Sequence, residues 1–253
     1  MSKKGAFYSG KYFKVALGIV LAVAVVGVGY FAYQASTVKV GDYVKWLGHA
    51  SFQIKAEGKT IYLDPYEGEY RDKADIILVT HSHADHCNVS KINSVRKSDT
   101  IIIAPADCVS KIGGEVRSIK PGDKILVGDV LVEAVEAYNY KRFSSPGNPY
   151  HPKGFGVGYL LTIGGKTIYH AGDTDSIPEM QNLKNIYLAL LPTGGTYTMD
   201  NQEAVEAALA IKPTYVIPMH RWNTDPAEFK TGVEAGSNIK VILLTPGEQF
   251  QLE

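Results

Sequence analysis

The segment VTHSHADHCN, residues 79–88, constrains this chain more than any other part of its sequence. His81, His83 and His86 are three of the seven histidines in the chain, and Asp85 lies among them. Imidazole and carboxylate groups are the usual protein ligands of zinc and similar divalent metals. A lone histidine is usually an ordinary core or surface residue, but four such side chains in six positions predict a metal site.

The residues before this segment indicate the fold that carries it. The run ADIILV is continuous and rich in β-branched residues, as in a strand buried on both faces. The metal ligands would then follow the carboxyl end of a strand, where open sheets place their sites. His81 and His83 are two residues apart, so an extended backbone points both rings to one side. Asp85 and His86 follow a turn, so this loop offers two ligand pairs and suits two neighbouring metals.

Other strands are predicted by short apolar runs between turn residues. YVKWLGHASFQIKA and TIYLDPY alternate like paired strands around an EGK turn, and IGGK predicts a hairpin at 163–166. Helices are predicted over 200–213, which opens with Asp200 and Glu203 in capping-box spacing, and over 225–236. Many strands with interspersed helices favour an α/β (α+β) chain with two sheets between helical layers.

The start of the chain differs from the rest. Residues 15–38 contain no charged side chain, and as a helix they would rise about 36 Å, enough to cross a hydrocarbon core about 30 Å thick. Four lysines precede this span. The pattern predicts a short cytoplasmic basic segment over 1–14, a single-pass transmembrane anchor over 15–36 and an extracytoplasmic domain over 41–253. A cleaved secretory signal is the alternative, although FAYQAS offers no clean cleavage site.

Composition limits the classes of partner. The chain has 26 basic and 26 acidic residues, and without the four lysines of 1–38 the body keeps 22 against 26, a net charge of −4. Nucleic-acid binding needs a concentrated basic face, so we expect no nucleic-acid partner. Cys87 and Cys108 are too few for a disulfide framework, and we expect Cys87 to pack as a small apolar residue. The oligomeric state is not predicted.

One segment fits no regular element. Residues 138–154, YNYKRFSSPGNPYHPKG, contain three prolines, two glycines and no periodicity. Such loops are often lids or binding loops, and an ordinary surface excursion is the alternative. Lys141, Arg142, Phe143 and Tyr150 in this loop would either touch lipid headgroups or be solvated.

The motifs together resemble a known family. THSHADH resembles the H-x-H-x-D-H signature of the metallo-β-lactamase superfamily, and the likeness continues in chain order across residues 41–253. LGHASF, LDP, YHAGDTD, LLPTGGTYTMD and IPMH are similar to the branch with ascorbate-6-phosphate-type lactonases and N-acyl-phosphatidylethanolamine phospholipase D. The resemblance implies the αββα sandwich, in agreement with the strands and helices above.

The resemblance also implies a set of ligands. Asp173 maps to the aspartate that bridges two metals, and His220 maps to the last strand-end histidine. The first metal would be held by His81, His83 and Asp173, and the second by Asp85, His86, His220 and Asp173. Nitrogen-rich ligands favour zinc, and the bridging carboxylate also admits Mn²⁺ or Fe²⁺.

The chain departs from the family pattern at one ligand. The family usually has a histidine after the strand that here ends EAVEAYN, where this chain has Tyr138 and Asn139. Either His151 from the following loop replaces that ligand, or the first site is open and weaker. We favour His151, because its loop should border the site.

Supporting and catalytic roles follow from the same positions. Asp64 should support the metal loop through hydrogen bonds. His49 should orient a loop by hydrogen bonding or support a metal ligand, and His170 should be a supporting or structural residue rather than a ligand. We expect the metal ligand Asp85 to be a catalytic residue, together with Tyr197 and Arg221. Tyr197 should face the mouth of the site. Arg221, beside His220, would bind a phosphate or carboxylate, or form a surface salt bridge.

The predicted function is a membrane-anchored hydrolase with two divalent cations. A hydroxide that bridges them would cleave an ester, lactone or phosphodiester bond of a small-molecule or lipid substrate. A phospholipase-D-like phosphodiesterase on membrane lipid is one alternative, and a non-catalytic metal-binding or scaffold module is the other. The fold by itself does not imply β-lactam hydrolysis.

Overall fold

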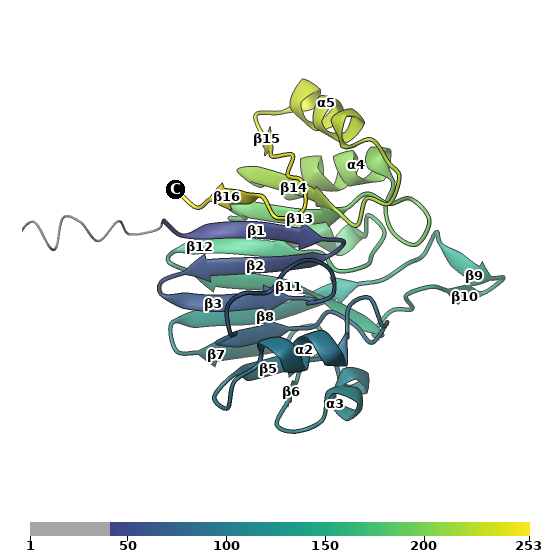
Figure 1. The fold of residues 1–253 in the computed structure, drawn as a ribbon. Coiled ribbons are helices and arrows are strands. Elements are labelled where there is room, and N and C mark those ends of the chain that lie inside the picture. Colours follow the sequence, from purple (N-terminus) through teal and green to yellow (C-terminus); the bar gives the residue numbers. More distant parts are fainter. Residues whose placement is uncertain (1–40) are drawn as a thin grey trace, which may run out of the picture. The chain divides into compact units, whose positions relative to one another are not determined.

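The computed structural model describes residues 41–253, which form one compact unit (Figure 1). The predicted basic segment at 1–14 and anchor at 15–36 lie outside the described residues, so both stay predictions. Within residues 41–253, no helix combines the length and the apolar character needed to cross a membrane.

Two seven-stranded sheets form the centre of the fold. The first has the order β16-β1-β2-β3-β4-β5-β6 and comprises β1 (Tyr43–Gly48), β2 (Ser51–Ala56), β3 (Lys59–Leu63), β4 (Ile76–Leu78), β5 (Ile101–Ala104), β6 (Arg117–Ser118) and β16 (Gln249–Gln251). The second has the order β15-β14-β13-β12-β11-β8-β7 and comprises β7 (Lys124–Val127), β8 (Val130–Ala137), β11 (Gly156–Ile163), β12 (Lys166–His170), β13 (Leu188–Pro192), β14 (Tyr215–Met219) and β15 (Lys240–Val241).

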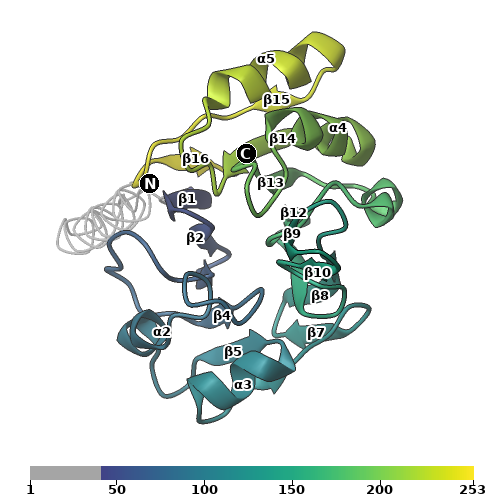
Figure 2. The ribbon, with the colours of Figure 1, turned by 90° about the vertical axis from the view of Figure 1, so that its right-hand side faces the viewer.

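Helices cover the outer face of each sheet (Figure 2). They are α2 (Val89–Val95) and α3 (Ala106–Ile112) at the first sheet, and α4 (Asn201–Ile211), α5 (Pro226–Gly236) and the short 3₁₀ helix η1 (Pro178–Asn182) at the second. Alternation along the strands creates the layers, because successive side chains point to opposite faces. Leu188 and Leu190 of β13 pack between the sheets, whereas Ala189 and Leu191 pack against α4 and α5. The predicted αββα sandwich is confirmed.

Local signals located several elements correctly. Gly164 and Gly165 have φ of 56° and 76° and join β11 to β12 in the predicted IGGK hairpin. Both predicted helices are present as α4 and α5. Asp200 and Glu203 form the predicted capping box at the start of α4.

Two features differ from the sequence analysis. Helices α2 and α3 were not predicted, because seven residues are too few for a clear helical period. The expectation that residues 138–154 contain no regular element is wrong, since β9 (Phe143–Ser145) and β10 (Asn148–Pro149) form a small hairpin. Figure 1 shows this hairpin extending away from the two sheets. Its pairing is short and local, which leaves little periodicity to detect.

The strand directions place the site. β1, β3 and β4 run parallel to one another in the first sheet, as do β8, β12 and β14 in the second. Their carboxyl ends lead into the segments that contain His49, Asp64, residues 80–86, Asn139, Asp173 and His220. Parallel strands end at the same edge of a sheet, so distant segments meet there.

Candidate metal centre

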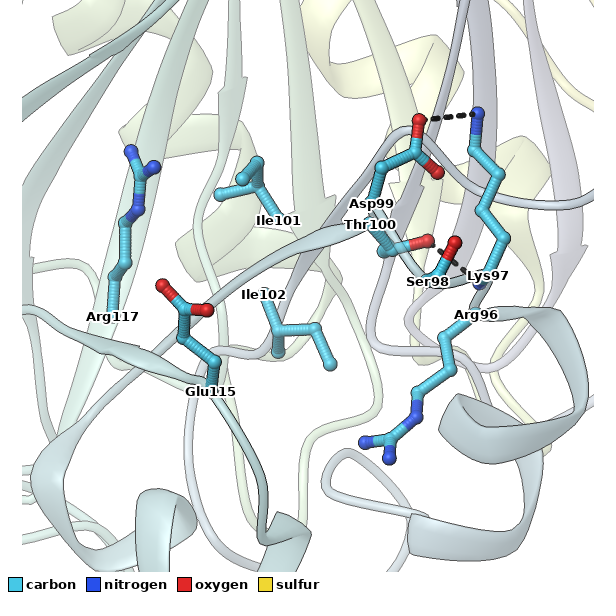
Figure 3. Close-up of a pocket in the computed structure, with 9 residues that line it drawn as sticks. All are labelled: Arg96, Lys97, Ser98, Asp99, Thr100, Ile101, Ile102, Glu115 and Arg117. Atoms are coloured by element: carbon cyan, nitrogen blue, oxygen red, sulfur yellow. Dashed lines mark hydrogen bonds and ion pairs between the residues drawn. The ribbon is translucent and has the colours of Figure 1, made fainter.

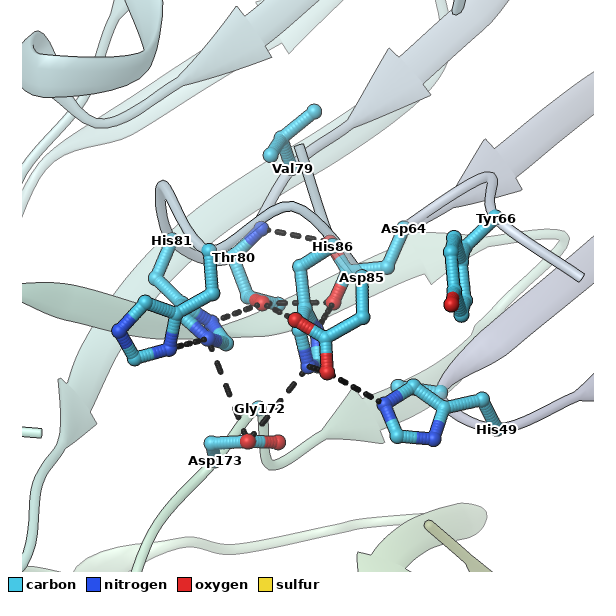
Figure 4. Close-up of polar contacts among 12 residues, drawn as sticks. His49, Asp64, Tyr66, Val79, Thr80, His81, Asp85, His86, Gly172 and Asp173 are labelled. Carbon is cyan, nitrogen blue, oxygen red and sulfur yellow. Dashed lines mark hydrogen bonds and ion pairs between the residues drawn. The ribbon is translucent and has the colours of Figure 1, made fainter. Parts of the chain in front are cut away.

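The seven predicted ligands come together at this edge. His81, His83 and His151 form one group, called here the first cluster, and Asp85, His86 and His220 form the second cluster. Within each group the donor atoms lie within 4.8 Å of one another. Asp173 groups in turn with His81 and His86, one residue from each cluster (Figure 4).

The first cluster has the spacing of a ligand set. His83 Nδ1 lies 3.1 Å from His81 Nε2 and 3.2 Å from His151 Nε2. With zinc–nitrogen bonds of about 2.0–2.1 Å, two tetrahedral ligand nitrogens lie about 3.3–3.4 Å apart. A neutral imidazole has one N–H, so three rings that converge in this way cannot all be satisfied by one another. The geometry therefore places His151 where a third ligand belongs.

Asp173 connects the two clusters. Its Oδ2 lies 3.2 Å from His220 Nε2, 3.4 Å from His151 Nε2 and 3.5 Å from His86 Nε2. Among the described residues, Asp173 Oδ1 and His86 Nε2 are buried without a hydrogen-bond partner. Buried polar atoms without a partner are rare, and divalent cations would satisfy these two. The donors present therefore fit a bound metal.

His49 lies closer to the metal donors than the sequence analysis expected. Its Nε2 is 3.1 Å from Asp85 Oδ2, and its ring centroid is 3.8 Å from that of His220. The contact with Asp85 agrees with an orienting role. The four side chains His49, Asp85, His86 and His220 are also near enough to form one donor group.

Asp64 fixes the orientation of His86 (Figure 4). Its Oδ2 lies 2.7 Å from His86 Nδ1, and it accepts the hydroxyl of Thr80 at 2.6 Å. Its Oδ1 accepts the backbone N–H of Thr80 at 2.7 Å. A proton held on Nδ1 leaves the lone pair on Nε2, which faces Asp173. The predicted supporting role of Asp64 is confirmed.

Asn139 performs the same task for His151 with a neutral group. Its Oδ1 lies 2.7 Å from His151 Nδ1 and accepts the backbone N–H of His151 at 3.0 Å. Its amide donates to Asp175 Oδ1 at 3.0 Å, and Arg142 forms an ion pair with that carboxylate at 2.7 Å. The residue at the position of the missing histidine therefore orients His151. This role was not predicted, although the strand-end position of Asn139 was a signal.

Burial and charge act differently on the two clusters. Burial lowers the pKa of His81 well below its usual value and that of His151 to about 4. Burial also disfavours protonated His86, but the carboxylates of Asp173 and Asp64 outweigh it and raise the pKa of His86 well above its usual value. The first cluster therefore presents neutral imidazoles at pH 7, whereas the second retains a proton in the absence of metal.

Strained backbone is concentrated around the second cluster. Seven non-glycine residues in the described part of the chain have positive φ, and His49, Asp64, His220 and Trp222 are four of them, with φ of 42–49°. Each such residue costs about 1–2 kcal/mol. His220 is held by its backbone N–H, which donates to His49 O at 3.0 Å. Strained backbone conformations cluster at functional sites.

The two other predicted catalytic residues lie at the open side. Tyr197 is 37% exposed and packs edge-on against Tyr150, with ring centroids 4.7 Å apart. The Arg221 guanidinium lies 4.1 Å from the ring centroid of Trp46 and donates to Leu244 O at 2.8 Å. No described carboxylate lies within 4.0 Å of Arg221, so it does not form the surface salt bridge considered as an alternative. The catalytic roles of both residues stay predictions.

Three residues near the centre are structural. His170 is buried, donates from Nε2 to Ala50 O at 2.9 Å and accepts the N–H of Gly172 at 3.2 Å. Cys87 and Cys108 are buried, unbonded to each other and packed under α2 and α3. These positions agree with the sequence analysis.

A separate surface pocket lies beside β5 and β6 (Figure 3). Its lining, Arg96–Ile102 with Glu115 and Arg117, contains no histidine. Lys97 pairs with Asp75 at 2.8 Å and with Asp99 at 3.6 Å, so its charge is already neutralised. None of the predicted site residues lines this pocket, and we assign no chemistry to it.

Comparison with known proteins agrees with this geometry. The model of the beta-lactamase superfamily domain matches residues 43–220. A metal-dependent hydrolase of Pelotomaculum thermopropionicum is 34% identical over 229 residues, which covers 83% of this chain and 99% of the relative.

Solved structures are similar over most of the chain. A protein from Parabacteroides distasonis described as a metal-dependent hydrolase is 37% identical, with a TM-score of 0.74 over 79% of this chain and 91% of that one. The metallo hydrolase Igni18 from Ignicoccus hospitalis is 26% identical, with a TM-score of 0.70 over 85% and 99%. This chain therefore belongs to the metallo-β-lactamase superfamily, as one of its metal-dependent hydrolases.

Proposed function

We propose that this hydrolase binds two divalent cations and cleaves an ester, lactone or phosphodiester bond. One observation carries the proposal: Asp173 Oδ2 lies within 3.5 Å of His151 from the first cluster and of His86 and His220 from the second. A shared carboxylate is a common bridge between two adjacent cations. The ligand set favours zinc, and Mn²⁺ or Fe²⁺ would also be accepted.

The chain's own residues prepare the site for this chemistry. When bound, two such ions lower the pKa of a coordinated water and polarise the oxygen of the bond to be cleaved. Asp64 and Asn139 hold His86 and His151 so that their Nε2 atoms face Asp173. Tyr197 and Arg221 would contact substrate, and Arg221 would take a carboxylate or phosphate group.

The lipid phosphodiesterase alternative has less support. Its sequence argument rested on the predicted anchor and on the loop residues Lys141, Arg142, Phe143 and Tyr150. Lys141 pairs with Glu203 at 2.8 Å, and Arg142 pairs with Asp175 at 2.7 Å. Both charges are therefore already partnered, and we favour a small-molecule substrate. The scaffold alternative rested on the missing third histidine, and the contact of His151 with His83 supports the enzyme over that alternative.

Membrane anchoring through residues 15–36, with residues 41–253 outside the cytoplasm, remains part of the proposal. It is supported by the uncharged span and the four preceding lysines. The full chain should stay in the membrane pellet after an alkaline wash. Recovery in the supernatant would contradict the anchor without affecting the proposed chemistry.

The chemistry is tested by metal analysis and a substrate screen of the full chain in detergent. We expect two zinc ions per chain and hydrolysis of at least one of three probes: a simple lactone, bis(p-nitrophenyl) phosphate and a thioester. The His86→Ala variant should lose metal and turnover together, because His86 is a buried donor of the second cluster. Leu126→Ala, on the exposed strand β7, is the matched control. A metal-free, inert wild-type chain would support the scaffold alternative instead.

A further inference from the structure

A pocket of about 640 Å³ opens beside the second cluster. Asp85 and His49 form part of its wall, whereas no residue of the first cluster lines it. The remaining wall is mixed. Its apolar and aromatic part includes Trp46, Tyr66, Trp222, Leu243, Leu244 and Pro246, and its polar part includes Glu67, Arg221, Asn223 and Thr224. The pocket therefore offers an apolar and aromatic surface next to the donors of the second cluster but not next to those of the first.

Trp222 is the most exposed aromatic residue of this wall, at 57%. Its ring lies edge-on to two histidines of the centre, with centroids 5.4 Å from His49 and 5.5 Å from His220. Its backbone has a φ of 47°, an unusual conformation for a bulky residue. The indole thus stays largely open to solvent while it touches the rings beside the metal donors.

Gly194 packs closely against one side of the indole. A Cβ atom at this position would lie 2.4 Å from Trp222 Cδ1 and 2.4 Å from His220 O. Only glycine lets this loop approach so closely, and the approach leaves no room for the indole to move toward it. On this side, Trp222 therefore packs directly against the loop, and its other side remains open to a ligand.

Exposed apolar side chains gather around this position. Leu243 of the same pocket is 37% exposed, and so is Tyr197, whose ring centroid lies 6.2 Å from that of Trp222. In the described part of the chain, three of the six exposed large hydrophobic residues meet here. Contiguous exposed apolar surface next to a catalytic centre usually marks a ligand site.

We infer that this pocket binds an apolar, aromatic group of the substrate on the second-cluster side, and that Trp222 determines this specificity. The inference rests on the proposed hydrolase function and names its substrate class: an ester, lactone or phosphodiester with an aromatic substituent. An aromatic ring would pack against the exposed indole in an edge-to-face or offset arrangement. That contact holds the bond to be cleaved beside Asp85 and Asp173.

Binding of two thiols to the zinc-loaded full chain tests the inference without requiring turnover. A thiolate is a good zinc ligand, so benzyl mercaptan and 2-mercaptoethanol would both bind at the metal centre, and only the first has an aromatic group. Calorimetry should show that benzyl mercaptan binds about tenfold more tightly than 2-mercaptoethanol. This ratio corresponds to about 1.4 kcal/mol from the aromatic contact.

Variants assign that preference to one side chain. Trp222→Ala should weaken the binding of benzyl mercaptan by about 5- to 10-fold and the binding of 2-mercaptoethanol by less than about twofold. Trp222→Phe should restore most of the difference, because it keeps an aromatic face. Leu126→Ala removes an exposed apolar side chain elsewhere, 67% exposed, and should change neither affinity.

The possible failures are separable. If Trp222→Ala weakens the binding of both thiols equally, the indole only supports the metal ligands. If the binding of benzyl mercaptan is unchanged in this variant, the indole does not contact the aromatic group. Either result overturns the inference. A chain that shows the expected thiol preference but hydrolyses none of the three probe classes would keep the aromatic pocket and overturn the proposed reaction.

Discussion

The two histidine clusters receive their support from groups of different charge. In the second cluster, the carboxylate of Asp64 holds His86 at 2.7 Å. In the first, the neutral amide of Asn139 holds His151 at the same distance. Hydrogen bonds to an ionised group are roughly twice as strong as neutral ones, and a carboxylate partner also makes the imidazole a more basic ligand.

This difference has a consequence for metal binding. The pKa of His151 falls to about 4 through burial, whereas the carboxylates around His86 raise its pKa well above the usual value. The first cluster can therefore accept a cation at neutral pH without losing a proton, while the second must release one. In return, we expect the second cluster to hold its cation more tightly, since its ligands are more basic and include Asp85.

Removing Asp64 should have the largest effect. The Asp64→Ala variant leaves His86 and Thr80 without their buried acceptor, so we expect the free energy of unfolding of the metal-free chain to fall by about 3 kcal/mol. Zinc affinity of the second cluster should fall by up to about 100-fold. Urea unfolding and zinc titration against a chromophoric chelator measure the two effects. Asp64→Asn, which keeps the volume, should be intermediate; if it matches the wild type, the charge of Asp64 has no role.

Removing the Asn139 acceptor should have a smaller and more local effect. Asn139→Leu keeps the volume but frees the His151 ring, so the affinity of the first cluster should fall by about tenfold while the second is unchanged. Cobalt titration, read as two spectroscopic steps, separates the clusters. Asn139→Asp should not rescue binding, because its new carboxylate would face Asp175, 3.0 Å away across the present hydrogen bond. Equal weakening of both steps would contradict the assignment.

The pH dependence of stability should show an effect that builds up gradually over several pH units. Unfolded histidine titrates near pH 6.5, whereas His151 in the metal-free folded chain resists protonation until about pH 4. Between these values the unfolded state binds more protons, so stability falls as the pH falls, by at most about 1.4 kcal/mol per pH unit for this residue. The raised pKa of His86 has the opposite effect on stability, and only above pH 6.5. There the folded state binds more protons than the unfolded state, so stability falls as the pH rises.

Urea midpoints of the metal-free full chain between pH 7 and pH 4.5 measure this slope. His151→Gln should flatten it but not abolish it, because burial also lowers the pKa of His81. An unchanged slope in this variant would show that His151 is not protected from protonation in the folded state.

Much of the fold was predictable because its signals are local. The glycine pair of the β11–β12 hairpin and the capping box of α4 each lie within four residues. The strand runs follow from the two-residue period of side-chain direction. Helices α2 and α3 were missed because they are short, and their apolar residues are buried by packing on the first sheet rather than by a clear pattern.

The residues of the candidate site also divide into those revealed by local sequence and those that depend on distant contacts. His81, His83, Asp85 and His86 were recognisable because one loop contains them all. The choice of His151 could not be settled from the sequence, since its contact with His83 spans 68 residues. Asn139 and Trp222 had no signal strong enough to reveal their roles, because both roles depend on a partner from another strand end.

By itself, the sequence determined which ligand types are available, the strands and main helices, and the family. These features depend on the order and spacing of neighbouring residues. Only the tertiary structure decided that an amide orients His151, that His49 touches Asp85 and that the Trp222 indole stands over the second cluster. Those contacts exist because two separate sheets bring their strand ends to one edge, and the packing of sheets is a property of the whole chain.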